Sequence, residues 1–383
     1  MKKKWLILAV LLMAYFAPNY LQYQLSPIST DIIQGYSISP VMFSRVFSAP
    51  MIPAVFLSLL SGVLADKYGP KPVIGISLVI SCAGSILRFY STTYSMLFLS
   101  MLMIGVAGAV VNANGVKVIS CAFSRDKVGV LTGVFLSSST IAMSLATGTT
   151  SILGSIRAVY LLGVIITIAA TLLWFFLAEN SDLTSPATPN GTAYSYFRNV
   201  AKKRSVIISS ITLFFVMSCM IGIASFLPLA LSSRGISEVA AGAYTAAFTI
   251  GNLIGSLSSP IVDQKWKSTK IQTIALVIII GSGTIFAWRF VPGFPLLLAL
   301  ITTGAGIGGI MPLMISFPVK SGEISPGEAG ISGGIISTLQ LLGAILMPSY
   351  IIAPITGDNY SLFFLVTGSL MVLPLIIIWL FHK

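Results

Sequence analysis

The stretch Gly62-Val-Leu-Ala-Asp66-Lys67-Tyr-Gly69-Pro-Lys71 is a short polar connector between two long apolar segments. Its two glycines permit tight helix ends and close approach of neighbouring helices. Asp66 can accept hydrogen bonds from the N-terminus of a neighbouring helix, where the helix dipole favours an anion. Lys67 and Lys71 can pair with acids or lipid phosphates, although a solvated loop would carry the same lysines. The stretch therefore predicts a structured connector between two apolar helices.

The segments on both sides belong to a chain that is apolar along its whole length. Of its 383 residues, 56% are hydrophobic and 8% are charged, whereas soluble domains average about 25% charged residues. The apolar residues form blocks of about 20 residues, the length that crosses a hydrocarbon core about 30 Å thick. Because lipid-exposed backbone must satisfy its own hydrogen bonds, these blocks must be helices. We expect an all-α membrane protein with twelve transmembrane helices, at residues 5–28, 39–61, 72–89, 94–120, 128–150, 156–178, 205–230, 239–261, 270–289, 294–317, 328–350 and 360–381.

The charges outside these spans predict the orientation of the chain. The net charge is +12, but the basic residues stand in short connectors without a continuous basic face, which argues against nucleic acid as a partner. The positive-inside rule places both termini in the cytoplasm of a bacterial cell, with the chain in its inner (plasma) membrane. The run from Trp5 to Leu25 has no clear small-x-small cleavage site, so we expect a retained first span and not a signal peptide. The basic residues assigned to the cytoplasmic side are Lys2, Lys3, Lys4, Lys67, Lys71, Arg125, Lys127, Arg198, Lys202, Lys203, Arg204, Lys265, Lys267, Lys270, Lys320 and Lys383, whereas Arg88, Arg157, Arg234 and Arg289 stand at span ends on the other side.

The longest polar connector divides the spans into two groups of six. It contains Ser-Pro, Thr-Pro and Asn-Gly dipeptides, which favour turns and loops. We expect an N-terminal six-helix bundle over residues 1–178, a cytoplasmic linker over 179–204 and a C-terminal six-helix bundle over 205–383.

Two pairs of matching connectors indicate that the two halves are a repeat. Three residues at the start of the fifth span recur at a constant offset at the start of the eleventh: Ser124, Gly129 and Gly133 match Ser325, Gly330 and Gly334. Asp66 after the second span likewise corresponds to Asp263 after the eighth, each with a small residue four positions earlier. Duplicated halves are a recurring transporter design, in which the solute site lies where the halves meet.

The stretch 62–71 resembles the loop signature of the major facilitator superfamily, G-x-x-x-D-(R/K)-x-G-(R/K)-(R/K). The position of the stretch, the number of spans and the degenerate second copy at Asp263 agree with this resemblance, which covers essentially the whole chain. The resemblance implies two pseudo-symmetric six-helix bundles and secondary transport of a solute by alternating access.

The same resemblance implies a conformational latch at the ends of the spans. In it, Asp66 engages the start of the eleventh span and a basic residue near the fourth, for which Arg125 is the candidate. The residues assigned to this latch are Gly62, Asp66, Lys67, Gly69, Lys71, Arg125 and Asp263.

Two further stretches resemble a narrower group of carriers. Residues 114–133 are similar to the junction of the fourth and fifth spans in cyanate/nitroimidazole-type permeases, and residues 304–312 are similar to their tenth span. The first span lacks the arginine-proline element of that group. The loop at 66–71 and the tyrosine-rich first span also resemble oxalate/formate and monocarboxylate carriers, although the arginine of their eighth span and the lysine of their eleventh are missing. All these relatives carry small anions, so the resemblance implies an anionic solute and leaves the subfamily open.

Two basic residues inside the predicted spans are candidates to bind that solute. Arg45 lies in the outer part of the second span and Lys117 in the inner part of the fourth, while no Asp or Glu falls clearly within a span. Charges inside a bilayer are costly and are therefore functional candidates. A cavity with basic groups attracts anions, and the planar fork of arginine can bind two carboxylate oxygens. Each side chain could instead extend to the nearest membrane interface.

Polar and aromatic residues expected at mid-span depth form a second group of candidates. Asn114 and Lys117 are three residues apart on one helix face, and three side chains of the first span recur every four residues. By the same resemblance the first, fourth, seventh and tenth spans line the cavity, which favours the candidates on the first and fourth. Each residue could instead make an ordinary hydrogen bond between helices. The group comprises Tyr15, Asn19, Tyr23, Asn112, Asn114, Tyr244, Asn252, Trp288 and Gln340.

Glycines in two spans predict close contacts between helices. Gly251 and Gly255 are four residues apart in the eighth span, and the tenth span has a glycine-rich run from Gly304 to Gly309. Small residues at this spacing let the backbones of two membrane helices approach.

Other functions are disfavoured by features that the sequence lacks. Cys82, Cys121 and Cys219 form no CxxC pair and His382 is the single histidine, so we expect no metal site and no cofactor. The connectors are too short for a catalytic or signalling domain, which disfavours an enzyme or sensor. A multidrug or hydrophobic-compound exporter of the same superfamily is the alternative, although residues 137–148 lack the proline of the glycine-proline motif that many exporters carry. We expect a monomer whose partners are a small solute and the lipid bilayer.

Overall fold

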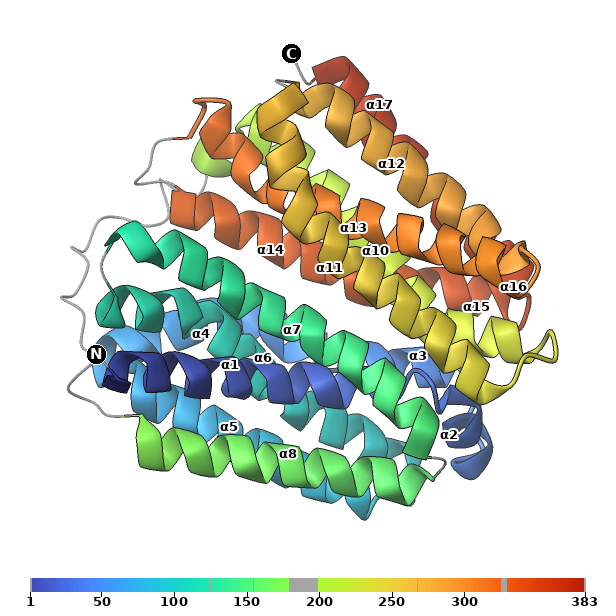
Figure 1. Cartoon of the computed structure of the whole chain (residues 1–383), viewed down its shortest axis with the longest axis horizontal. Helices are drawn as coiled ribbons and strands as arrows, with labels where there is room; N and C mark the ends of the chain where they lie inside the picture. Colours follow the sequence, from blue (N-terminus) through green and yellow to red (C-terminus); the bar gives the residue numbers. More distant parts are fainter. Residues whose placement is uncertain are drawn as a thin grey trace. The chain divides into compact units, whose positions relative to one another are not determined.

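The protein is built from helices, most of them long enough to cross a bilayer. The computed structural model describes residues 2–123, 125–153, 155–178, 199–266, 268–324 and 329–381. Within them every regular element is a helix, and 12 helices are long and apolar enough to cross a membrane (Figure 1). The predictions of the fold class and of twelve spans are confirmed.

The chain divides into two compact units, Met1–Thr188 and Pro189–Lys383. Most of the predicted linker, residues 179–198, lies outside the described residues. The first unit contains α1 (Lys2–Tyr23), α2 (Ser29–Gly35), α3 (Pro40–Ser48), α4 (Met51–Tyr68), α5 (Pro70–Phe89), α6 (Tyr94–Ala122), α7 (Arg125–Leu153) and α8 (Ile156–Leu177). The second unit contains α10 (Arg204–Ser232), α11 (Glu238–Trp266), α12 (Thr269–Phe286), η2 (Ala287–Arg289), α13 (Phe294–Lys320), α14 (Ala329–Ile345), the π-helical segment η3 (Leu346–Ile352), α15 (Ala353–Thr356), α16 (Tyr360–Ser369) and α17 (Val372–Phe381).

The first span is shorter than its apolar pattern predicts. The helix α1 ends at Tyr23, although the prediction extended to residue 28. A residue that precedes a proline is disfavoured in a helix, and Pro27 lies in the turn that leads to α2. The prediction of helix through residue 28 is therefore wrong.

The second span consists of two helices, so the prediction of one helix over residues 39–61 is also wrong. The helices α3 and α4 meet at Ala49 and Pro50, and Pro50 has no N–H group to continue the hydrogen bonds of α3. The backbone of Pro50 lies against Gly105 of α6, where a Cβ would overlap it. The helix α6 thus packs closely against the bend between α3 and α4.

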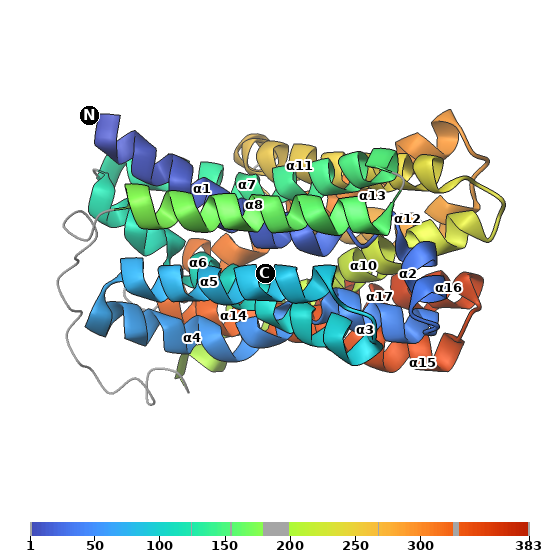
Figure 2. The same ribbon diagram turned by 90° about the horizontal axis from the view of Figure 1, so that it is seen from below.

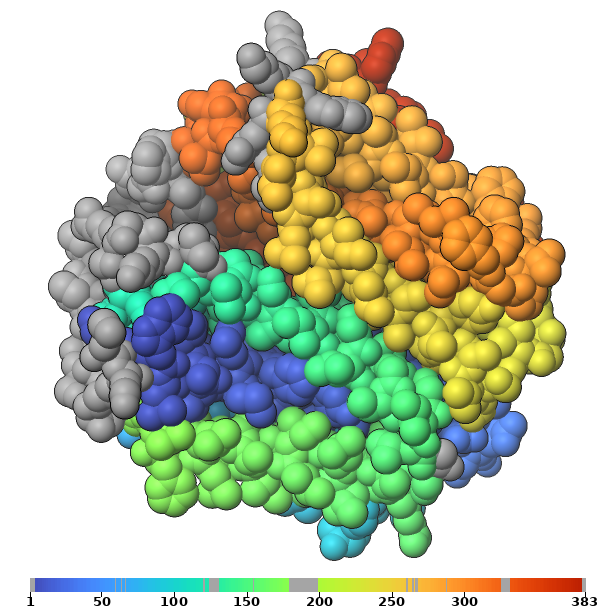
Figure 3. Space-filling view, in the orientation of Figure 1, coloured from blue at the N-terminus to red at the C-terminus, as the bar shows by residue number. Residues whose placement is uncertain are grey.

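The core of the first unit gathers around α1, which contacts α6, α7 and α8. Figure 2 shows α5 and α8, which also contact each other, and Figure 3 shows the surface of α1 between those of α7 and α8. Trp174 of α8 is fully buried, and its Nε1 donates to the carbonyl oxygen of Lys71 at 3.0 Å. This bond attaches the first turn of α5, directly after the stretch 62–71, to the core.

Glycines hold two long helices of the second unit together. At four glycines of α11 and α13 an added Cβ would overlap a carbonyl oxygen of the other helix. The overlapping pairs are Gly251 with Ile301, Gly255 with Ala305, Gly304 with Phe248 and Gly308 with Asn252. Such close approach strengthens van der Waals packing between membrane helices. The contact that the glycine spacing predicts is confirmed, and α11 and α13 lie side by side in Figure 1.

The repeated connectors take equivalent places in the two units. Asp66 lies in the last turn of α4 and Asp263 in the last turn of α11. Gly129 lies near the start of α7 and Gly330 at the start of α14. Each unit therefore presents its repeated residues at the same ends of equivalent helices.

Candidate functional site

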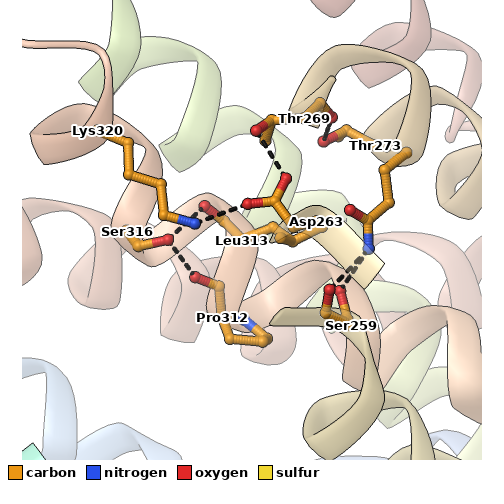
Figure 4. A network of polar contacts seen from close by, with 9 residues as sticks. Ser259, Asp263, Thr269, Thr273, Pro312, Leu313, Ser316 and Lys320 are labelled. Carbon is orange, nitrogen blue, oxygen red and sulfur yellow. Dashed lines mark hydrogen bonds and ion pairs between the residues drawn. The ribbon is translucent and has the colours of Figure 1, made fainter. Parts of the chain in front are cut away.

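An ion pair joins three helices of the second unit at one end. Asp263 of α11 accepts a hydrogen bond from Lys320 Nζ of α13 at 2.7 Å. Its other carboxylate oxygen accepts one from Thr269 Oγ1 of α12, also at 2.7 Å (Figure 4). The side chain of Asp263 is 8% exposed and that of Lys320 is 49% exposed. Because each carboxylate oxygen has its own donor, the burial of this charge is offset by its partners.

A glutamine extends this network along α12. Gln272 Nε2 donates to the carbonyl oxygen of Ser259 at 3.0 Å and to its hydroxyl oxygen at 2.9 Å. Ser259 is the small residue four positions before Asp263, and it corresponds to Gly62 in the sequence repeat. Since glycine has no hydroxyl, the second unit gains here a polar contact for which the first unit has no equivalent side chain.

A carboxylate also caps the first helix of the second unit. Glu323 Oε2 accepts hydrogen bonds from the backbone N–H of Ser205 at 3.0 Å and from its hydroxyl at 2.9 Å. The first amide groups of a helix lack partners within it, and the helix dipole favours an anion there. The sequence did not single out Glu323, because no local pattern relates two residues that lie 118 positions apart.

The equivalent connector of the first unit is described in part. The side chains of Asp66 and Arg125 lie outside the described residues, so the pairing of these two residues stays a prediction. Lys67 is exposed, and its Nζ lies 4.9 Å from the centroid of the Tyr68 ring. Lys71 is partly buried and begins the helix α5 together with Pro70.

The two glycines of this connector differ in their roles. Gly69 has a φ of 85°, a left-handed conformation that favours glycine, and it ends α4. Gly62 lies inside α4, and no described atom stands within 4 Å of the Cβ that it lacks. The prediction of a tight helix end is therefore confirmed for Gly69, and close approach at Gly62 stays a prediction.

Tyr15 belongs to an aromatic contact in the first unit. Its ring stacks on that of Phe135 of α7, with the centroids 4.5 Å apart, and its hydroxyl contacts Ser139. Phe135 is fully buried, and its ring fills the space where Gly115 of α6 would carry a Cβ. One ring thus joins α1, α6 and α7. The sequence missed Phe135, because a single phenylalanine in a span of small residues gives no periodic signal.

Asn114 and Lys117 lie one turn apart on α6. Asn114 is fully buried and donates from Nδ2 to Ser61 Oγ of α4 at 3.2 Å and to the carbonyl oxygen of Val110 at 2.9 Å. Lys117 is partly buried and interacts with other residues. Asn112 is exposed, so the structure separates it from the buried Asn114.

The other candidates of the first unit make local or aromatic contacts. Asn19 Nδ2 donates to the carbonyl oxygen of Tyr15 in its own helix at 2.8 Å. Tyr23 is buried, with its ring centroid 5.4 Å from that of Phe47. Arg45 of α3 is partly buried and interacts with neighbouring groups.

The candidates of the second unit are more widely spread. Tyr244 accepts a hydrogen bond on its hydroxyl from the Gly293 N–H at 2.6 Å, in the connector before α13. Asn252 is buried in α11, and Gln340 is partly buried in α14. Trp288 lies in η2 beyond the end of α12. The expectation of mid-span depth is wrong for Trp288, because α12 ends two residues before it.

A buried arginine joins three helices at the opposite end of the first unit. Arg88 of α5 is fully buried, and its guanidinium donates to the Leu21 carbonyl oxygen and to Gln24 Oε1, both at 2.7 Å. It lies 4.8 Å from the ring centroid of Tyr160, and a Cβ at Gly163 of α8 would overlap it. The last carbonyl groups of a helix lack partners and favour a cation, so Arg88 caps α1. From the sequence, Arg88 is one of four basic residues at span ends on the side opposite the termini. An isolated arginine at a span end predicts no further contact.

These groups fall into two sets by their place along the helices. Ion pairs and caps lie at helix ends, whereas amide and aromatic groups lie within the spans. Within the residues that the structure describes, no group of three His, Cys, Asp or Glu side chains could hold a metal ion.

Comparisons with known proteins agree with this architecture. The family model described as Major Facilitator Superfamily matches residues 5–348. A mutant of the nucleoside transporter NupG has a TM-score of 0.81 at 17% identity, with 100% of both chains covered. An inward-facing, unoccupied bacterial homolog of the human lysosomal transporter Spinster has a TM-score of 0.75 at 13% identity, with 98% of this chain and 95% of that chain covered.

One curated relative shares a shorter stretch of sequence. The riboflavin transporter RibZ of Clostridioides difficile (strain 630) is 25% identical over 134 residues. This stretch is 35% of the present chain and 29% of that protein, so the match spans less than a third of the relative's length.

Proposed function

Since the chain belongs to the major facilitator superfamily, and is therefore a secondary transporter rather than an enzyme, we propose that it carries a small anion by alternating access. The distribution of charge along the spans carries this proposal. Arg45 and Lys117 lie inside spans, whereas Glu238 and Asp263 are the first and last residues of one span. The other carboxylate residues whose side chains the structure describes are Asp31, Glu323 and Asp358, all of which lie outside the spans.

An excess of basic groups inside the spans favours an anionic solute for electrostatic reasons. A charge in a low-dielectric region is costly unless a partner or a function compensates it. Basic groups near a water-filled path raise the local concentration of anions. Arg45 can bind two oxygens of a carboxylate or of a similar planar anion, whereas Lys117 supplies a compact charge.

We assign the remaining solute contacts to the polar and aromatic side chains within the spans. Asn114 lies one turn before Lys117 on α6, and the Tyr15 ring lies beside Phe135. The other members of the proposed site are Asn19, Tyr23, Asn112, Tyr244, Asn252 and Gln340. The solutes that fit the proposal are cyanate, nitrate, nitrite and small mono- or dicarboxylates.

We further propose that the repeated acids act as latches of the transport cycle. In the second unit Asp263 pairs with Lys320, a base at the end of the tenth span. The first base after the end of the fourth span is Arg125. The described pair thus supports the pairing of Asp66 with Arg125.

The proposal includes a place and an orientation for the chain. We place it in a bacterial inner membrane with both termini in the cytoplasm, as two six-helix bundles over residues 1–178 and 205–383. The concentration of lysines at one end of the spans supports this orientation. A thiol reagent that does not cross membranes should label Lys320→Cys in inverted vesicles and not in intact cells; labelling in intact cells would reverse the orientation.

Transport by purified protein in proteoliposomes tests the choice of an anion. A thermal-shift screen first identifies an anion that stabilises the protein, because a ligand of the folded state raises its stability. Uptake of that anion should fall by more than about tenfold in Arg45→Ala and in Lys117→Ala, the loss expected when a charge-assisted contact is removed. The matched control Arg157→Ala removes an exposed arginine near the start of α8 and should transport within about twofold of the wild type. Normal uptake by both Arg45→Ala and Lys117→Ala would refute the assigned site.

A second candidate solute comes from the sequence match to RibZ. That protein is a riboflavin transporter, and the match suggests a planar heteroaromatic solute for the present chain. Riboflavin carries no charge, so its uptake should not depend on Arg45 or Lys117. Saturable riboflavin uptake that persists in both alanine variants, without uptake of any anion in the screen, would favour this candidate over the anion.

A further inference from the structure

The first unit contains an apolar groove that the transport proposal does not use. The groove lies between α4, α5 and α6 and has a volume of about 580 Å³, within the range of pockets that hold drug-sized molecules. Its walls are Leu57, Leu60, Ser61, Leu64 and Tyr68 of α4, Pro72, Val73, Ile76, Ser77 and Ile80 of α5, and Val106 and Val110 of α6.

The chemistry of the walls selects a hydrocarbon chain over a polar solute. Two of the lining residues, Ser61 and Ser77, carry aliphatic hydroxyl groups, and both hydroxyls already have partners. Ser61 Oγ donates to the Ser58 carbonyl oxygen at 3.1 Å and accepts from Asn114 at 3.2 Å. Ser77 Oγ donates to the Ile74 carbonyl oxygen at 2.7 Å. Sites for polar molecules need placed polar groups that fix orientation, and these serines offer no free hydroxyl proton to donate.

The length of the groove matches the depth of one lipid leaflet. On α4 its walls extend from Leu57 to Tyr68, which is about 16 Å along a helix that rises 1.5 Å per residue. Half of a hydrocarbon core about 30 Å thick is about 15 Å. Three side chains of the walls, Leu60, Tyr68 and Ile76, are at least half exposed, as expected for groups that face lipid.

Two lysines stand at the end of the groove where α4 meets α5. Tyr68 lines the groove, and the Nζ atom of Lys67 lies 4.9 Å from the centroid of its ring. Lys71 directly precedes Pro72, another wall residue, and its carbonyl oxygen is held by Trp174 at 3.0 Å. Neither lysine forms an ion pair with another side chain that the structure describes. The positive charge therefore lies beside the mouth of an apolar groove.

We propose that this groove binds an anionic phospholipid of the cytoplasmic leaflet. An acyl chain lies between α4, α5 and α6, and the phosphate lies beside Lys67 and Lys71. The charge complementarity at the mouth selects an anionic headgroup over a zwitterionic one, and the apolar walls hold the chain. The lipid would also touch Ser61, whose hydroxyl bonds to Asn114, so its binding reaches the contact between α4 and α6. The choice of leaflet rests on the orientation proposed above.

Native mass spectrometry of the purified full-length chain tests this proposal. The protein is titrated with phosphatidylglycerol or with phosphatidylcholine of the same acyl chains. The wild type should bind phosphatidylglycerol about tenfold or more tightly than phosphatidylcholine, and the double variant Lys67→Gln/Lys71→Gln should bind both alike. The matched double variant Lys202→Gln/Lys265→Gln removes two exposed lysines of the second unit and should keep the wild-type preference.

A second variant tests the groove itself. Ile76 is 61% exposed, so Ile76→Trp fills the groove without disturbing the core, and it should weaken the binding of both lipids. Equal binding of the two lipids by the wild type, an unchanged preference in Lys67→Gln/Lys71→Gln, or unchanged phosphatidylglycerol binding by Ile76→Trp would each overturn the proposal.

Discussion

The two repeated corners, α4–α5–α6 in the first unit and α11–α12–α13 in the second, are built differently around a shared acid. In the second corner Asp263 is tied to Lys320 and Thr269, and glycines bring α11 and α13 into backbone contact. In the first corner an apolar groove lies between the equivalent helices, although Asn114 of α6 bonds to Ser61 of α4, and lysines stand beside its mouth. The repeat therefore preserves the helix position of the acid but not the packing of the helices at that corner.

The positions of the glycines explain this difference. In α13, Gly304 and Gly308 face α11 and remove the side chains that would keep the helices apart. In α6, Gly105 instead faces Pro50 at the bend of the second span, and Gly115 faces the Phe135 ring of α7. The part of α6 that faces the groove carries Val106 and Val110 in place of glycines.

The largest expected effect concerns an arginine at the C-terminal end of α5 and one just after α12, away from these corners. Here the first unit has the more tightly held side chain. Arg88 is fully buried and donates to two acceptors, whereas Arg289 is exposed and bonds to Ser361. Arg88→Ala should lower the free energy of unfolding by about 3 kcal/mol, because it leaves a cavity and an uncapped helix end. Arg289→Ala should change it by less than about 0.5 kcal/mol. Thermal unfolding of both variants in the same detergent measures the difference.

A lysine at position 88 distinguishes the contribution of the positive charge to stability from that of the planar guanidinium group. Arg88→Lys keeps the cation but cannot donate in two directions with a planar group, so it should recover less than half of the lost stability. Equal losses in Arg88→Ala and Arg289→Ala would remove the contrast between the two ends.

The next effect concerns the glycine contact of the second corner. Gly308→Ala adds a Cβ that overlaps the Asn252 carbonyl oxygen, and such overpacking typically costs about 1–3 kcal/mol. Gly334→Ala adds the same atom on α14, where no described atom stands within 4 Å, and it should be neutral or stabilising by up to about 1 kcal/mol. Thermal unfolding of the two variants checks the contact, and a neutral Gly308→Ala would show that α11 and α13 can separate at no cost.

The sequence predicts those features that depend on local periodicity. The apolar blocks give the twelve spans, the spacing of Gly251 and Gly255 gives the contact between α11 and α13, and the connector at Gly69 gives a helix end. These features follow from composition and spacing within a single span. The errors at Pro27 and Pro50 occur where a proline overrides an apolar pattern.

The sequence does not predict contacts that depend on the rotation of one helix against another. Arg88 meets Leu21 and Gln24 across more than sixty residues, and Glu323 meets Ser205 across 118. The groove likewise depends on which face of α6 its glycines occupy. For the candidate solute site, the spacing of Asn114 and Lys117 predicts that they share one face of a helix. It does not predict that Asn114 is buried and Asn112 exposed, because that depends on how α6 packs against its neighbours.

The smallest expected effect concerns the shared acid itself. A double-mutant cycle with Asp263→Asn, Lys320→Gln and the double variant measures the coupling between the two side chains. The pair joins a nearly buried carboxylate to a half-exposed lysine, so we expect a coupling of about 1 kcal/mol at low salt. The coupling should decrease as salt is added, because salt screens exposed charges. Zero coupling at low salt would contradict a contribution of the ion pair to this corner.

The same cycle with Asp66→Asn and Arg125→Gln extends the comparison to the first corner. Thr269, which donates to Asp263, is the first residue of α12, and the first residue of α5 is Pro70. Because proline carries neither a hydroxyl nor an N–H donor, Pro70 cannot supply the second donor that Thr269 supplies to Asp263. We therefore expect the coupling of Asp66 with Arg125 to be weaker and more sensitive to salt than that of Asp263 with Lys320. A stronger coupling in the first corner would mean that a donor at the start of the following helix, such as Thr269, does not strengthen the pair.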